Sequence, residues 1–272
     1  MLKFVKTIFF SISFSFIFAQ GWQAVGARSM SLSNASVCLS DVWAFHHNPA
    51  ALANLEKTSV GISYENRYLL KELQAQGFVY AQAMKKGVLS FGGQLYGHSL
   101  YRSTRVGMGY SMQLSENISA GVQLNYQSLR ISNYGQKGTL SGEFGMLAKI
   151  KVKVGFSVFN LNNAKLSDFQ DDRFSTYLRL GLSYAISSKV LLLAEAEKQV
   201  ESKLRPKGAL EYQMSDKFFL RVGAAGNPLE LTFGSGFAFD NGFKLDFGTA
   251  WHQLLGWSPH VGLTFDFKKP SK

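Results

Sequence analysis

Residues 118–129 read ISAGVQLNYQSL, and apolar side chains alternate with polar or small ones from Ile118 to Gln127. Successive side chains of a β-strand point to opposite faces, so this stretch would form a strand with one apolar face and one polar face. The apolar face would consist of Ile118, Ala120, Val122, Leu124 and Tyr126.

About fourteen segments of this kind follow one another between Lys57 and Phe267. Their connections are alternately very short and longer, which is typical of a transmembrane β-barrel with tight periplasmic turns and longer outer loops. We therefore expect an all-β fold, an antiparallel barrel of about fourteen strands, with a soluble β-sandwich as the alternative. The expected tight turns are Lys85–Gly87, Ser115–Asn117, Lys149–Lys151, Ile186–Ser188, Ser215–Lys217 and Asp240–Gly242, and the expected longer links are Asn66–Leu73, Arg130–Lys137, Leu161–Arg173 and His252–Ser258.

The aromatic residues favour the barrel over the sandwich. Two aromatic belts, one at each membrane interface, are typical of transmembrane barrels. The expected outer belt contains Tyr64, Tyr96, Tyr126 and Trp251, and the expected periplasmic belt contains Phe218, Phe239, Phe243 and Phe267.

The first twenty residues have the layout of a secretory signal peptide. Lys3 and Lys6 precede the apolar run Thr7–Phe18, and the small residue Ala19 precedes Gln20. This layout predicts cleavage near Ala19 or Gln20. An exported chain without a helical span of roughly twenty apolar residues can still enter a membrane as a closed barrel, because closure satisfies its backbone hydrogen bonds. We expect the outer membrane of a Gram-negative bacterium.

Residues 21–56 do not alternate and are rich in small side chains. Asn48 followed by Pro49 predicts the start of a short helix, with Asn48 as its cap. A segment of this kind before the first strand suits a plug inside the barrel. We expect a signal peptide at 1–20, a hatch at 21–56, a barrel at 57–267 and a periplasmic tail at 268–272.

Within this segment the chain resembles a known superfamily. GARSM at 26–30, SNASV at 33–37, LSD at 39–41 and NPAAL at 48–52 look like the N-terminal signature shared by the FadL hydrophobic-compound channels and the PorV/PorQ proteins of type IX secretion. The resemblance implies a fourteen-stranded outer-membrane barrel with an N-terminal hatch. Short loops and a filled lumen favour the PorV/PorQ-like branch. The hatch motif comprises Gly26, Ala27, Arg28, Asp41, Asn48, Pro49 and Ala50.

Charged residues of both signs fall on the face of the strands that is expected to line the lumen. Because an unpaired charge away from bulk water is costly, we expect these groups to pair across strands and to cross-link a plugged interior. The expected lumen charge network contains Arg105, Glu143, Arg179, Glu195, Glu197, Arg205, Lys207, Glu211, Arg221, Glu230, Lys244 and Asp246.

The net charge of +11 and the pI of about 9.6 have another expected source. Lysines collect at the tight turns, so most of the excess should form a basic periplasmic rim that includes Lys149, Lys151 and Lys153. Such a rim would meet outer-membrane lipid headgroups or an acidic partner. Nucleic acid is not an expected partner of an exported barrel.

The sequence carries no strong catalytic or cofactor motif. It has no Gly-x-Ser-x-Gly, phosphate-loop, Cys-x-x-Cys or His-Glu-x-x-His pattern, so no cofactor, metal or enzymatic activity is expected. Adjacent His46 and His47 point in different directions, and His252 and His260 lack a serine partner for a barrel lipase. Cys38, the single cysteine, is expected to be a small buried side chain.

Two functional hypotheses remain ahead of the enzyme. The first is a non-enzymatic accessory barrel that binds a secretion-machinery or cargo protein. The second is a passive channel for hydrophobic small molecules, which would leave sideways through a gap opened by glycine kinks at Gly92–Gly93 or Gly223–Gly226, since glycine weakens strand pairing.

Overall fold

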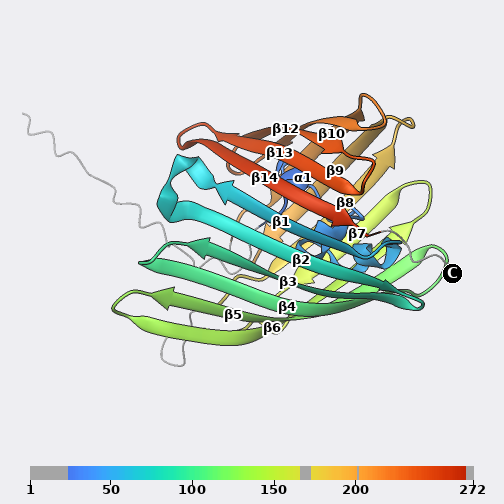
Figure 1. Ribbon diagram of the computed structural model, residues 1–272. Helices are drawn as coiled ribbons and strands as arrows, with labels where there is room; N and C mark the ends of the chain where they lie inside the picture. The colour runs from blue at the N-terminus through green and yellow to red at the C-terminus, as the bar shows by residue number, and fades with distance from the viewer. Residues whose placement is uncertain (1–23, 166–172, 201, 268–272) are drawn as a thin grey trace, which may run out of the picture.

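Fourteen antiparallel strands close into a barrel in the part of the chain that the structure, a computed structural model, describes: residues 24–165, 173–200 and 202–267 (Figure 1). The predicted fold class and strand number are thereby confirmed, whereas the predicted signal peptide and C-terminal tail lie outside the described residues. The strands are β1 Ser59–Asn66, β2 Gln74–Met84, β3 Gly87–Gly97, β4 Tyr101–Gln113, β5 Ile118–Ile131, β6 Gly135–Lys149, β7 Lys153–Phe159, β8 Tyr177–Ala185, β9 Val190–Gln199, β10 Arg205–Gln213, β11 Phe218–Ala225, β12 Glu230–Ala238, β13 Phe243–His252 and β14 Gly256–Asp266.

Closure comes from the pairing of β1 with β14, in which Ser59 lies opposite Asp266. Every other strand pairs with its neighbours in sequence, so no edge strand remains. The alternating pattern is inverted relative to a soluble protein: on β5, Val122 and Leu124 are more than half exposed, whereas Asn125 is buried inside. The apolar face of the wall therefore points outward, which excludes the sandwich.

The predicted connections are correct at one end of the barrel, whereas at the other end Asn66–Leu73 is correct and two of the expected links are too long. All six tight turns lie between strands as expected. The expected loops Arg130–Lys137 and His252–Ser258 are wrong, because only residues 132–134 and 253–255 lie outside the strands there. Polar residues such as Gln136 continue the strand ladder opposite Arg130, so polarity did not mark the end of the strand. The third expected link, Leu161–Arg173, is described only in part.

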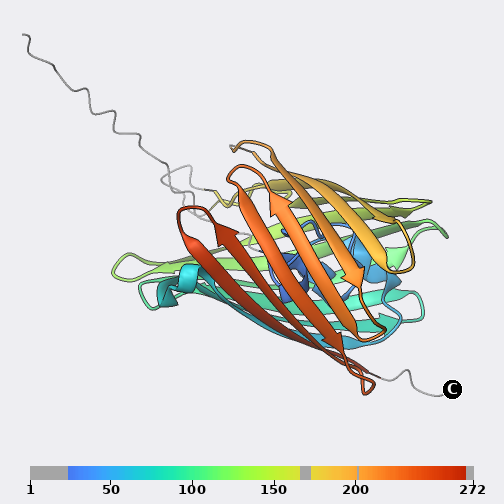
Figure 2. The ribbon, with the colours of Figure 1, turned by 90° about the horizontal axis from the view of Figure 1, so that it is seen from above.

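The N-terminal segment, residues 24–56, lies inside the barrel (Figure 2). It contains the short helices α1 Ala27–Met30, η1 Val42–His46 and η2 Pro49–Asn54, while η3 Arg67–Leu69 and η4 Lys71–Leu73 follow β1. The predicted helix start is confirmed, because the Asn48 side chain accepts a hydrogen bond from the Ala50 amide at 3.1 Å. None of the helices in the described ranges is both long and apolar enough to cross a membrane.

The apolar core of the molecule is built mainly by this segment. Its residues Val42, Trp43, Phe45 and Leu52 are almost completely buried and form one cluster with a few wall residues. Burial of these side chains away from water stabilises the segment inside the barrel. The wall contributes Val79, Ala81, Val88 and Leu147 to this cluster.

Glycines in the wall let the segment approach closely. A Cβ atom on Gly92 would lie 2.6 Å from the Phe45 ring, and one on Gly121 would lie 2.5 Å from the Pro49 backbone carbon. Similar close approaches occur at Gly61, Gly77, Gly145, Gly155, Gly181, Gly223, Gly234 and Gly248. We call these ten glycines the glycine belt.

The predicted glycine kinks are wrong. Register is unbroken through Gly92 and Gly93, which lie opposite Val79 and Phe78, and through Gly223, which lies opposite Thr232. At Gly92 and Gly223 the missing side chain makes room for the N-terminal segment and opens no gap in the wall.

Candidate functional site

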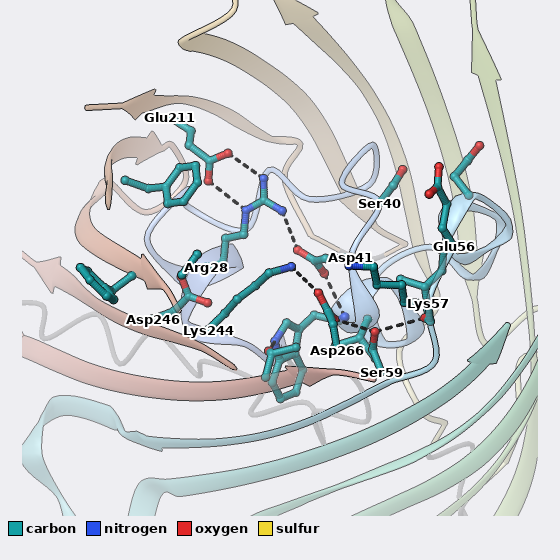
Figure 3. Close-up of a pocket in the computed structure, with 18 of the residues that line it drawn as sticks. Arg28, Ser40, Asp41, Glu56, Lys57, Ser59, Glu211, Lys244, Asp246 and Asp266 are labelled. Atoms are coloured by element: carbon teal, nitrogen blue, oxygen red, sulfur yellow. Dashed lines mark hydrogen bonds and ion pairs between the residues drawn. The ribbon is translucent and has the colours of Figure 1, made fainter. Parts of the chain in front are cut away.

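The candidate site is the seam between the N-terminal segment and the wall at the tight-turn end of the barrel. A cavity of about 360 Å³ lies there, and Figure 3 shows it with the side chains that surround it. Apolar residues come from the N-terminal segment and from the inner face of β11 and β12, and charged residues come from both sides. The apolar lining includes Val42, Trp43, Leu55, Phe219 and Ala238.

Arg28 is the charged residue that joins the segment to the wall at this cavity. Its guanidinium donates to both carboxylate oxygens of Glu211 on β10, at 2.6 and 2.9 Å, and to Asp41 at 2.8 Å. Such a bidentate, charge-assisted contact fixes the relative orientation of the two side chains as well as adding interaction energy. Gly26 precedes α1 with φ +102° and its backbone is packed against Trp43, a combination that only glycine tolerates without strain.

Glu211 is shared with a second arginine. The Arg221 side chain on β11 donates to Glu211 at 2.6 Å and to Asp246 on β13 at 2.6 Å. Asp41, Arg28, Glu211, Arg221 and Asp246 therefore form a continuous chain of opposite charges, which we call the ion chain. It ties the N-terminal segment to three strands of the wall, and Figure 3 shows the part in which Arg28 meets Asp41 and Glu211.

A second cluster of buried charges holds the N-terminal segment at Asn34 and Val37. Lys207 on β10 pairs with Glu195 at 2.9 Å and with Glu197 at 2.7 Å, both on β9. Glu195 also accepts from the Val37 amide at 2.9 Å, and Lys207 donates to the Asn34 carbonyl oxygen at 3.2 Å. These charges are thus satisfied by each other and by the backbone of the segment.

His46 and His47 are anchors that sequence reasoning missed. Arg105 on β4 lies 2.7 Å from His46 Nδ1, and Arg179 on β8 donates to the His47 carbonyl oxygen. Burial and the adjacent Arg105 hold the pKa of His46 well below its usual range, so the neutral ring can accept this hydrogen bond. The side chain of Glu143 on β6 is also buried inside the barrel. No group of residues in the described part of the chain could hold a metal ion.

The remaining predicted lumen charges lie at the two ends of the barrel. Arg205 pairs with Glu230 at 3.3 Å towards the loop end, and Lys244 pairs with Asp266 at 2.7 Å beside the cavity. Both pairs join neighbouring parts of the wall and do not touch the ion chain.

The basic rim is only one part of the positive surface. Lys149 and Lys153 lie opposite each other across the β6–β7 turn, and Lys151 is exposed within it. Lys71, Arg102 and Arg130 are also exposed, at the loop end, and the excess of positive charge at the tight-turn end stays a prediction.

Cys38 is buried, as predicted. Its sulfur lies 3.3 Å from the Gly181 carbonyl oxygen on β8. Burial raises the pKa of the thiol to about 12, and the negative charge of Glu195 acts in the same direction.

Comparisons with known proteins identify the fold. No protein-family model matches the chain, and the curated proteins contain no significant match. Among solved structures, the monoaromatic hydrocarbon channel CymD superposes with a TM-score of 0.74 at 13% identity, covering 93% of this chain and 100% of CymD. The toluene transporter TbuX of Ralstonia pickettii gives 0.66 at 12% identity, with 90% and 99% covered. A FadL homologue of Pseudomonas aeruginosa gives 0.62 at 11%, with 89% and 98% covered.

The chain therefore has the fold of the FadL-type outer-membrane barrels over nearly its whole length. The similar structures are channels and transporters of small molecules, not enzymes. At these identities the likeness concerns the fold alone, and the PorV/PorQ resemblance rests on the N-terminal motif.

Proposed function

We propose that this protein is a passive, non-enzymatic channel for small hydrophobic molecules across the outer membrane. In this proposal residues 21–56 act as the hatch and residues 57–267 as the wall. The observation that carries it is the cavity at the seam between hatch and wall, whose lining combines apolar side chains with the charged residues of the ion chain.

The size and chemistry of the cavity suit such a molecule. Ligand pockets are typically about 300–1,000 Å³ and combine apolar walls with a few placed polar groups. The seam cavity of about 360 Å³ falls within this size range, and Trp43, Phe219 and Ala238 give it an apolar part beside its charged lining. A molecule that reaches the lumen would leave along the seam, past Trp43 and Phe219, without removing the whole hatch. CymD and TbuX, by their descriptions, carry monoaromatic hydrocarbon and toluene, which adds support for this substrate class.

Flux of toluene into proteoliposomes tests the proposal. Ala238→Phe places a ring in the cavity and should reduce the flux severalfold. Ala196→Phe is the matched control, because Ala196 lies opposite Pro206 on the outward face of β9, and this variant should keep the wild-type flux. Equal flux through both variants, or none above empty vesicles, would count against the channel.

The second candidate is an accessory barrel that binds a secretion-machinery or cargo protein. The dense bonding of the N-terminal segment to the wall favours it, since a permanently closed barrel can still present a surface. Charge reversal of Lys149, Lys151 and Lys153 to Glu should then abolish co-purification of the partner while toluene flux persists. Unchanged co-purification would remove the rim from this hypothesis.

A further inference from the structure

Two arginines lie directly opposite each other on the outer surface of the wall. Arg102 on β4 and Arg130 on β5 are register partners, and both side chains are exposed. They share the outward face with Met108 and Leu124, which are more than half exposed to the surroundings of the barrel. The pair therefore faces the membrane side and not the lumen.

The surroundings of this pair favour an anion. Like charges directly opposite each other destabilise a sheet. Within the described residues neither guanidinium has an ion-pair or hydrogen-bond partner, unlike the arginines of the ion chain. Thr104 and Ser128 lie opposite each other next to the pair, and Gln136 lies beside Arg130 and donates to the Ser128 hydroxyl at 2.8 Å. Ser128 is itself buried, so the patch offers the two guanidinium groups and the exposed Gln136 amide, with no carboxylate among these residues.

Aromatic residues mark the depth of this patch. Tyr126 is exposed on the outward face of β5, and Ser128 and Arg130 follow it at alternate positions toward the loop end. Aromatic side chains of a barrel collect at the membrane interface. The arginine pair lies just beyond that level, where lipid headgroups are found. Figure 1 shows the long β5–β6 hairpin that carries this part of the wall.

We propose that Arg102 and Arg130, with Gln136, bind a phosphate group of lipopolysaccharide, the phosphorylated glycolipid of the outer leaflet. Guanidinium forks match phosphate oxygens in bidentate contacts, and two of them offset the charge of one phosphate. The loop end of such barrels faces outside, which selects the outer-leaflet lipid over the phospholipid of the inner leaflet. The site does not depend on what the lumen carries.

The test compares lipids that co-purify with the protein from outer membranes in mild detergent, quantified by mass spectrometry per barrel. Each arginine near a charged membrane surface contributes roughly 1 kcal/mol, or about fivefold in binding. Arg102→Gln with Arg130→Gln should therefore lower bound lipopolysaccharide at least fivefold. Lys137→Gln is the matched control, because Lys137 lies on the neighbouring strand opposite Leu129, which faces the other side of the wall, and it should retain the wild-type amount.

Three outcomes would overturn the proposal. Equal lipopolysaccharide in the wild type and the double variant would remove the arginines from lipid binding. An equal loss in Lys137→Gln would indicate a general effect of charge. Loss of phospholipid without loss of lipopolysaccharide would assign the site to the other lipid. Heat-modifiable migration of each variant in gel electrophoresis checks that the barrel is folded.

Discussion

At the scale of single residues, Glu211 holds the N-terminal segment on the wall. Its carboxylate receives Arg28 from the segment and Arg221 from β11, and Arg28 also reaches Asp41. Removing one member of such a buried chain leaves the remaining charges buried and unpaired. This costs more free energy of folding than the intact ion pair contributes. The exposed pair of Lys217 and Asp240 has the same charges but little burial.

Glu211→Gln is therefore expected to destabilise the barrel by on the order of 3 kcal/mol. Lys217→Gln should change stability by less than about 1 kcal/mol, because exposed ion pairs contribute little. The measurement is the temperature at which the folded barrel loses its heat-modifiable migration. Similar temperatures for the two variants would show that the ion chain does not hold the structure.

The Cys38 thiol should be unreactive in the folded protein. Its raised pKa of about 12 leaves almost no thiolate at pH 8, and its burial blocks access. Maleimide at pH 8 is expected to label Cys38 only after denaturation. Ser187→Cys, which places a thiol in an exposed turn, is the positive control. Rapid labelling of native Cys38 would mean that the segment leaves the lumen readily.

At the scale of elements, the N-terminal segment follows the wall as it runs. Ala27 approaches Gly248 on β13, Ser31 approaches Gly234 on β12, and Val37 approaches Gly181 on β8. The second part of the segment then packs Phe45 on β3 and Pro49 on β5. The glycine belt is the complement of this path, so a side chain added there must displace the segment.

Gly121→Ala should destabilise the protein by about 1–3 kcal/mol, the usual cost of overpacking. The new Cβ would meet the Pro49 and Ala50 backbone within 2.5–2.6 Å, and backbone cannot rotate away. Gly208→Ala is the control, because nothing lies within 4 Å of its Cβ position. Chemical unfolding in detergent compares the stability of the two variants. A Gly121→Ala variant as stable as the wild type would contradict the close approach of the segment to Gly121.

At the scale of the whole molecule, the N-terminal segment packs inside the barrel, and we propose that it seals the lumen. Apolar packing, the ion chain and the Lys207 cluster act together around the lumen. A hydrophobic molecule could follow the seam, whereas hydrated ions would meet buried apolar and paired charged groups.

Planar bilayers should therefore show almost no ion conductance for the wild type. Deletion of residues 26–54 should open a large, steady conductance, because it removes the segment that fills the lumen. If this deletion fails to fold, the paired substitutions Trp43→Ala and Phe45→Ala are expected to raise leakage within an intact wall. Wild-type conductance of a size typical of open pores would refute the seal.

The sequence by itself determined the strand pattern, the strand number and the tight turns, because each depends on alternation over a few neighbouring residues. It also placed the Asn48 cap and the buried Cys38. Only the tertiary structure decided the partners of the charges: Arg28 meets Glu211, 183 positions away, through closure of the whole barrel. The glycine kinks failed for the same reason, since a glycine in a strand indicates close approach or weak pairing equally well until the packed segment is known.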